Sequence, residues 1–236
     1  MADDRAPLTF NQTVKGIADF IEVAIHTILY VRQVYPAEIF VRRKKYNTPV
    51  FQSRHPALNE YISGAVKAIK DQLALGNVDK VVVVIKSSSE DIAYERFIFA
   101  VRNMIEVEPF NKDTRVENAM TAVTLGQYFR SFLVKLCMVE SQLGALDLQD
   151  DITFAVVLEL KDDKAPSVTQ SQEPPPWVPT TTLHTTFGAS DQAELHMIRA
   201  VDTGIINLSL AVQESEQKIS TLKESQQSAK GKKRAF

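Results

Sequence analysis

The sequence has few of the residues from which most catalytic and metal sites are built. It holds one cysteine, Cys137, and four scattered histidines, so it predicts neither a disulfide framework nor a cluster of metal ligands at a known spacing. Its eight glycines never lie within ten residues of one another, whereas P-loops and dinucleotide-binding loops need closely spaced glycines. A GxSxG nucleophile elbow is also missing. These absences argue against an enzyme, and no cofactor or metal is expected.

An excess of charge of one sign is missing too. The formal net charge is −2, from 27 cationic and 29 anionic side chains. No global basic field therefore draws the chain to nucleic acid, and direct sequence-specific nucleic-acid binding is not expected. The chain has no charge-free apolar run of 18 residues and no secretory h-region, so no membrane association is expected. A single cysteine fits a reducing compartment, cytosol or nucleus.

The residues that are present indicate one α+β domain with appendages. Thr9 and Gln12 match a capping box and predict a long helix from Phe10 to Val34, apolar over a wide arc and therefore largely buried. Further helices are predicted from Pro56 to Gly76 and from Val116 to Leu143, the latter with Val123 and Cys137 mostly inward. Strands are predicted at Ile39–Ser53 (a hairpin turning at 46–49), Val81–Ile85, Phe97–Val101 and Ile152–Leu160. The Val81–Ile85 run lacks polar alternation, which predicts a strand that is covered on both faces or lies in the middle of the sheet.

The amino-acid composition changes after Leu160. Residues 161–193 are polar, hold five of the ten prolines and include the single tryptophan, Trp177. So long an irregular stretch is usually functional or disordered. A hairpin is predicted beyond it, with strands at 195–201 and 205–212. The lysine-rich tail from about Ser215 is predicted to be disordered.

Two basic runs leave alternatives open. Arg42-Arg43-Lys44-Lys45 reads as a solvated strand edge that discourages pairing, or as a surface for DNA phosphate or an acidic partner. The terminal group Lys230, Lys232, Lys233 and Arg234 reads as a nuclear-import patch or as a plain solvated tail. An acidic group at Asp147, Asp150 and Asp151 reads as a solvated turn.

One long stretch resembles a known family. The residues Phe20 to Pro36, followed by Arg43-Lys44-Lys45-Tyr46-Asn47, His55-Pro56 and Lys80 to Ile85, are similar in order and spacing to the HORMA-domain accessory subunits of translesion DNA polymerase zeta. The likeness covers about seventy residues closely and is looser along Phe129–Lys135. Past Leu160 it continues only at Pro176-Trp177, around Leu195-His196-Met197 and in the last strand.

The resemblance implies a fold and a mechanism. The implied fold is a HORMA domain, with three long helices packed on a mainly antiparallel sheet and a C-terminal segment called the safety belt. The implied divisions are a flexible N-terminus (1–8), a HORMA core (9–160), a belt with its hairpin (161–214) and a disordered basic tail (215–236). In this family a client peptide pairs with the sheet as an added strand, and the belt crosses over it. Because the belt must open first, the peptide dissociates slowly.

The resemblance also implies site residues. Tyr61 and Trp177 match positions that pack on the peptide; without it, they read as a helix-flank tyrosine and a core tryptophan. Leu195, Ser209 and Ala211 match positions that bind the scaffold translesion polymerase, although Ser209 and Ala211 are smaller than the family's residues. Arg130 and Arg42 match a surface for HORMA homodimers and otherwise read as solvated arginines. No residue is assigned a catalytic or metal-binding role.

The predicted function is therefore a non-catalytic adaptor. Its expected client is a Pro-containing peptide of the catalytic subunit of polymerase zeta, which the adaptor bridges to other translesion synthesis and repair factors. The expected compartment is the nucleus, with the cytoplasm left open. The alternatives are a HORMA adaptor of spindle-checkpoint or meiotic signalling with another client, and an enzyme of unrecognised type.

Overall fold

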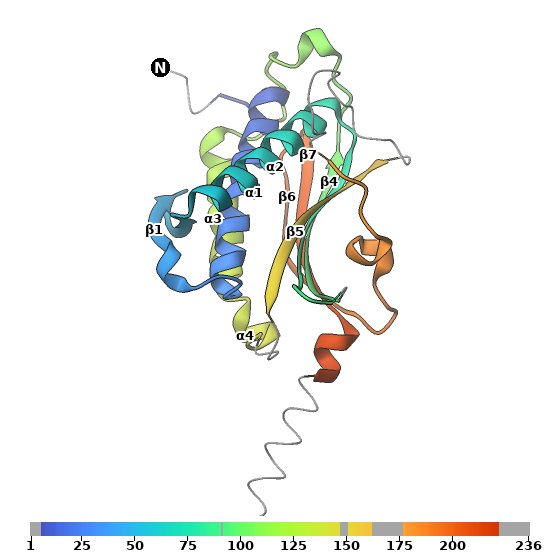
Figure 1. Ribbon diagram of the computed structural model, residues 1–236. Coiled ribbons are helices and arrows are strands. Elements are labelled where there is room, and N and C mark those ends of the chain that lie inside the picture. Colours follow the sequence, from blue (N-terminus) through green and yellow to red (C-terminus); the bar gives the residue numbers. More distant parts are fainter. Residues whose placement is uncertain (1–5, 91, 147–150, 162–176, 222–236) are drawn as a thin grey trace, which may run out of the picture.

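A computed structural model describes residues 6–90, 92–146, 151–161 and 177–221 of the chain. Three long helices cover one face of a five-stranded antiparallel sheet, and a two-stranded hairpin lies against the helices on their outer side (Figure 1). None of the helices in the described ranges has both the length and the apolarity needed to cross a bilayer. The α+β architecture predicted from the sequence is confirmed.

The first two helices begin where the sequence places them. α1 (Phe10–Val31) starts at a capping box, in which Thr9 Oγ1 accepts a hydrogen bond from the Gln12 N–H at 3.1 Å and Gln12 Oε1 accepts one from the Thr9 N–H at 3.0 Å. It ends three residues before the predicted Val34, because Gln33 adopts a positive φ of 52°. α2 (Pro56–Leu75) has proline in its first turn and ends at Gly76 with φ 75°, a left-handed cap that favours glycine.

The third helix differs from its prediction. α3 (Ala122–Cys137) is shorter, and a separate turn, α4 (Glu140–Leu143), follows it. The start predicted at Val116 is wrong because Thr121 caps the helix, its side chain accepting from the Thr124 N–H at 3.2 Å. Val123, predicted to point inward, is 52% exposed because it falls on the outer side of this shorter helix.

The N-terminal boundary also needs correction. Pro7 forms an isolated β-bridge with Thr121, and the Leu8 N–H donates to the Met120 carbonyl at 2.9 Å. Leu8 is buried in the core, so the prediction of a flexible segment is wrong for these two residues. Residues 1–5 lie outside the described part of the chain.

The sheet is antiparallel throughout its described pairings, in the order β5-β3-β4-β7-β6. The Val81–Ile85 and Phe97–Val101 segments, both predicted as strands, pair antiparallel with each other. The chain thus makes β3, β4 and β5 consecutively and then travels to the opposite edge for its last hairpin. The strands are β3 (Val78–Ser87), β4 (Ala93–Asn103), β5 (Ile152–Leu160), β6 (Glu194–Asp202) and β7 (Ile206–Glu214).

The separate hairpin consists of β1 (Phe40–Lys45) and β2 (Thr48–Ser53). Its turn is tighter than predicted, because Tyr46 and Asn47 both have positive φ, the geometry of a two-residue type I′ turn. β2 packs on α1 and α3, whereas the cationic side chains of β1 are exposed to solvent. Short 3₁₀ turns complete the chain at Ala37–Ile39 (η1), Pro109–Asn111 (η2), Thr182–His184 (η4) and Thr186–Gly188 (η5).

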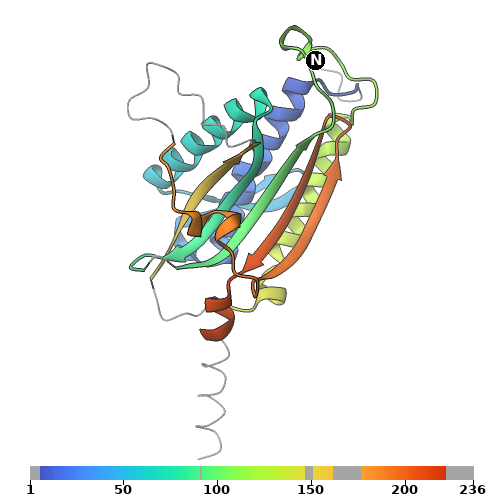
Figure 2. The same cartoon turned by 90° about the vertical axis from the view of Figure 1, so that its right-hand side faces the viewer.

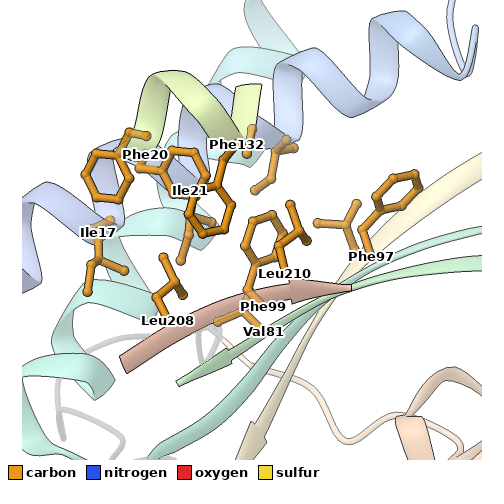
Figure 3. Packing of buried hydrophobic residues seen from close by; sticks show 14 of the residues in the cluster. Ile17, Phe20, Ile21, Val81, Phe97, Phe99, Phe132, Leu208 and Leu210 are labelled. Carbon is orange, nitrogen blue, oxygen red and sulfur yellow. The ribbon is translucent and has the colours of Figure 1, made fainter. Parts of the chain in front are cut away.

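The main core fills the space between the helices and the sheet (Figure 3). Phe20 of α1 stacks on Phe129 of α3 with ring centroids 4.4 Å apart and meets Phe99 of β4 edge to face. On β7 the inward and outward residues alternate, with Leu208 and Leu210 fully buried on the helix side. The C-terminal hairpin therefore contributes to the core and is not an appendage.

The opposite face of the sheet, here called the far face, carries a smaller apolar cluster. Val82, Val84, Ala93, Ile98 and Val157 form it. In the Val81–Ile85 run, the side chains that face the helices and those that face the opposite side are thus all buried. This confirms that the strand is covered on both faces.

A buried charge cluster closes one end of the fold. The Arg32 guanidinium donates to both oxygens of Glu95, at 2.7 and 2.9 Å, and Lys218 Nζ donates to Glu95 Oε1 at 2.6 Å. Lys218 also pairs with Glu214. Residues 216–221 are helical and Lys218 is fully buried, so the disordered tail predicted from Ser215 is wrong up to residue 221. The import patch and the rest of the tail lie outside the described residues.

Candidate peptide-binding edge

β5 has one paired and one free edge in the described part of the chain. Its paired edge bonds to β3, and within the described residues no strand pairs with its other side. The Asp151 carbonyl accepts from the Ser88 N–H, and the Lys161 N–H donates to the Asn77 carbonyl. The main-chain N–H and C=O groups of the odd-numbered residues therefore face β3. Antiparallel ladders alternate, so positions 152, 154, 156, 158 and 160 direct their N–H and C=O groups outward. Such a row is a template for another strand.

Tyr61 stands beside this free edge. It projects from α2, remains 47% exposed and packs edge to face on Phe154 of β5 at 5.5 Å. Its hydroxyl accepts a long hydrogen bond, 3.4 Å, from the outward N–H of Val156. The side chain predicted to contact a peptide therefore already touches the main-chain group that a peptide would use.

The helix side of the free edge is apolar. Phe154, Leu158 and Leu160 are partly buried and pack against the main core. Tyr35 meets the Phe154 ring at 6.2 Å, again edge to face. A strand added here would lay alternate side chains on this apolar surface, which gives a basis for side-chain selectivity.

The segment from Trp177 to Gly188 passes around the free edge. Trp177 is partly buried and packs against the main core on the helix side. The chain then runs exposed through residues 178–182 and places η4 and η5 on the far face; it is the orange segment in Figures 1 and 2. Figure 2 shows it in front of the sheet, with the helices behind. A strand lying along β5 would thus be enclosed by this segment. From here on, the belt means this described segment, Trp177–Gly188, of the longer belt predicted at 161–214.

Polar contacts fix the belt to the far face. Glu159 accepts hydrogen bonds from the Thr186 N–H at 2.5 Å and the Thr186 hydroxyl at 2.7 Å, and pairs with Lys80 at 3.1 Å. Arg96 donates to the Leu183 carbonyl. Burial would lower the pKa of Lys80, but its hydrogen bonds to Glu159 and Asp79 raise it, which keeps the ammonium charged. Burial lowers the pKa of Arg96, and the Glu159 charge opposes this.

The predicted second interface lies on the far face of the C-terminal hairpin. Ser209 and Ala211 occupy alternate positions of β7, between the residues that enter the core. Leu195 pairs across from Gln213, on the same face, and is 60% exposed. Met197, opposite Ala211 and 63% exposed, belongs to the same surface but was missed, although its alternation with Leu195 is visible in the sequence.

The two arginines predicted for dimerisation are both exposed, Arg130 on α3 and Arg42 on β1. A groove of about 1070 Å³ lies between the hairpin and the end of α3, with Arg42, Val134 and Met138 in its lining. Cys137 lines it too and is exposed, so its prediction as a core residue is wrong. Partial burial raises the pKa of its thiol, which is the opposite of an activated nucleophile.

Other polar groups have structural explanations. Glu194, His196 and Glu214 bring potential metal-ligand atoms within 4.8 Å of one another. Glu214, however, already binds His196 at 2.9 Å and pairs with Lys218. His26 is buried, and this burial lowers its pKa to about 4, so its ring is neutral at pH 7. Asp147 and Asp150 lie outside the described residues.

Comparison with known proteins identifies the family. The model of the HORMA domain matches residues 13–206. The chain belongs to the HORMA family. It is 31% identical over 224 residues to the mitotic spindle assembly checkpoint protein MAD2B of Gallus gallus, covering 91% of this chain and 97% of that protein. It is 32% identical over 168 residues to the DNA polymerase zeta processivity subunit of Arabidopsis thaliana, covering 71% and 72%.

Solved structures show the same fold at lower identity. A chain in the crystal structure of the mitotic checkpoint complex matches with a TM-score of 0.67 at 21% identity, covering 86% of this chain and 98% of that one. The HORMA protein HTP-2 of C. elegans, bound to a HIM-3 closure motif, matches with a TM-score of 0.66 at 13% identity, covering 89% and 92%. The resemblance and the HORMA fold predicted from the sequence are therefore confirmed.

Proposed function

We propose that this HORMA protein is a non-catalytic adaptor that captures a Pro-containing peptide of the polymerase zeta catalytic subunit. The peptide pairs with the free edge of β5, and the belt closes over it. The adaptor then bridges this client to other translesion synthesis and repair factors in the nucleus. Similarity to a polymerase zeta processivity subunit supports this choice of client.

One observation carries the proposal: β5 presents an outward row of main-chain groups, and the belt passes around that same edge from Trp177 to Thr186. Strand addition supplies main-chain hydrogen bonds without requiring any catalytic group. The test is purification of the tagged full-length chain from its own cells, followed by mass spectrometry of cross-links to β5. Cross-links to a Pro-containing segment of a polymerase catalytic subunit are expected, whereas cross-links to other protein classes would reject this client.

A checkpoint or meiotic pathway is the second candidate. The relatives named as spindle assembly checkpoint proteins and the neighbour bound to a closure motif favour it. The edge and belt would work in the same way with a different client. In that case the same cross-linking experiment would recover a checkpoint or chromosome-axis protein.

The other predicted surfaces complete the adaptor. Leu195 and Met197 are exposed on the far face, beside the half-buried Ser209 and the buried Ala211. This surface is distant from the helices and suits a scaffold translesion polymerase as second partner. Arg130 and the groove beside Arg42 suit a HORMA homodimer. Because these surfaces differ from the β5 edge, peptide capture leaves both of them accessible.

Replacing Trp177 by alanine is expected to weaken peptide binding by about 2 kcal/mol, the loss typical of an interface anchor. The indole is only partly buried in the peptide-free chain, so it has surface left to cover a bound strand. Calorimetric titration of the peptide measures the effect, with Val178→Ala, a 79% exposed neighbour on the belt, as matched control. Thermal unfolding provides the second measurement: a large loss of stability with unchanged affinity would make Trp177 a core residue.

Replacing Glu159 by alanine is expected to speed peptide release about tenfold. The carboxylate holds the belt through Thr186 and Lys80, and loss of hydrogen bonds worth about 1.4 kcal/mol in total corresponds to that factor. Displacement of a fluorescent peptide by excess unlabelled peptide gives the dissociation rate. Glu117→Ala, at an exposed carboxylate away from the belt, is the control. An unchanged dissociation rate would mean that the belt does not limit release.

A further inference from the structure

The densest group of cations in the described chain lies on one strand. Arg42, Arg43, Lys44 and Lys45 are consecutive in β1, and all four are exposed. The whole chain carries a net charge of −2, so this strand is a local positive region on a slightly acidic protein. The peptide site on β5 makes no use of it.

Among the residues that the structure describes, three of these cations have no anionic partner. Within the described residues, no carboxylate lies within salt-bridge distance of Arg42, Arg43 or Lys44. Lys45 differs, because its charge acts on Glu22. Burial and Asp19 raise the pKa of Glu22, while Lys45 opposes that rise. The positive potential is therefore concentrated on Arg42, Arg43 and Lys44.

These three residues border a shallow hollow of about 520 Å³ together with Asn47, Thr48 and Pro49. Asn47 is exposed, and its side-chain amide is a group that can donate to phosphate oxygens. The planar arginine guanidinium can donate two hydrogen bonds to one phosphate. Cations two residues apart on the strand lie on the same side, about 6.8 Å from each other. The hollow is thus open and bordered by three cationic residues.

A solvated edge and an acidic protein partner explain less. One charge is enough to block pairing at a strand edge, yet here four cations follow one another. A protein partner usually needs an aromatic or apolar anchor in a pocket. The neighbouring groove offers such anchors, but Arg43 and Lys44 do not line it. Phosphate needs no such anchor.

We propose that Arg42, Arg43 and Lys44 form a phosphate-binding strand that holds the backbone of DNA without sequence preference. The binding is electrostatic, weak and sensitive to salt, in the range of about 10⁻⁴–10⁻⁶ M expected of non-specific contacts. It rests on β1 alone, so it holds or fails independently of peptide capture on β5.

The test is fluorescence anisotropy of a labelled 20-nucleotide oligothymidine with the full-length chain at several salt concentrations. The double variant Arg43→Gln/Lys44→Gln leaves Arg42 in place for the proposed dimer. It is expected to bind about tenfold more weakly in low salt and to lower the slope of log affinity against log salt by about 1.4, or 0.7 for each lost contact. The control Lys67→Gln/Lys70→Gln removes two exposed cations from α2 and is expected to leave both values unchanged.

Each other outcome overturns the proposal. Equal losses in both double variants would indicate general charge attraction. Loss of all binding on neutralising Lys230, Lys232, Lys233 and Arg234 would place the contact in the C-terminal tail. Absence of binding at 50 mM salt would leave a solvated edge, and stronger binding of a polyglutamate peptide than of DNA would indicate an acidic protein partner. Circular dichroism of each variant verifies that the fold is kept.

Discussion

A proline in place of Val156 is expected to lower the affinity for the client peptide about 100-fold while the sheet stays assembled. The Val156 N–H points away from β3 and meets the Tyr61 hydroxyl, so its removal costs no bond of the β3–β5 ladder. A strand added at this edge would lose one main-chain donor, worth about 1–3 kcal/mol when its partner is left buried, and would meet the proline ring. About 2.8 kcal/mol corresponds to the expected factor.

The neighbouring position supplies the matched control for this prediction. Val157 has the opposite parity, so its N–H faces β3 and its side chain lies in the far-face cluster. Val157→Pro is expected to destabilise the fold itself, which thermal unfolding would show. If Val156→Pro keeps both its fold and its full affinity for the peptide, strand addition at this edge is wrong.

Replacing Glu95 by glutamine is expected to lower the free energy of unfolding by about 3–5 kcal/mol, the range for breaking one partner out of a buried ion cluster. Glu95 lies between Arg32 and Lys218, and all three side chains are almost completely buried. Among the described residues, glutamine keeps the shape but leaves Arg32 without a carboxylate partner and Lys218 with Glu214 alone. Urea denaturation measures the change.

Two further variants locate the effect of the Glu95 substitution. Glu117→Gln, at an exposed carboxylate, is expected to change the free energy of unfolding by less than about 0.5 kcal/mol. Lys218→Met removes one buried cation and leaves Arg32 paired with Glu95, so it should cost less than the Glu95 substitution. A loss below about 1 kcal/mol for Glu95→Gln would mean that water reaches the cluster.

The elements with explicit local signals were the ones predicted well. Thr9 with Gln12 located the start of α1, and Pro56 and Gly76 located both ends of α2, because caps are local interactions between near neighbours. The third helix is an exception. Thr121 caps it locally, but Thr121, Met120 and Val116 also pair with Pro7 and Leu8, and no local pattern shows that these contacts keep residues 116–120 out of the helix.

The buried cluster was not visible for a similar reason. Lys218 belongs to a polar, lysine-rich stretch that composition alone describes as disordered. Its burial depends on Glu95, which is 123 residues away in the chain. A charged residue becomes a core residue only when its partner is placed, and this placement is a property of the tertiary fold.

The candidate site was predicted only in part. Tyr61 and Trp177 came from the family resemblance, and their roles as peptide contacts stay predictions. The proline content indicated an irregular segment, but the path of that segment around β5 depends on Glu159 and Thr186, which no motif singled out. Phe154 is one of several apolar residues on its strand, and the sequence does not show that Tyr61 packs against it.

Amide hydrogen exchange on the full-length chain, with and without a Pro-containing peptide of the polymerase catalytic subunit, tests strand capture most directly. Exchange at Phe154, Val156 and Leu158 reports on the outward amides of β5, while Ala155 and Val157 are already bonded to β3. Peptide binding is expected to slow exchange at least about tenfold at the three outward amides and along the belt from Val178 to Thr186. A peptide that binds tightly while those three amides keep their original exchange rates would contradict the account.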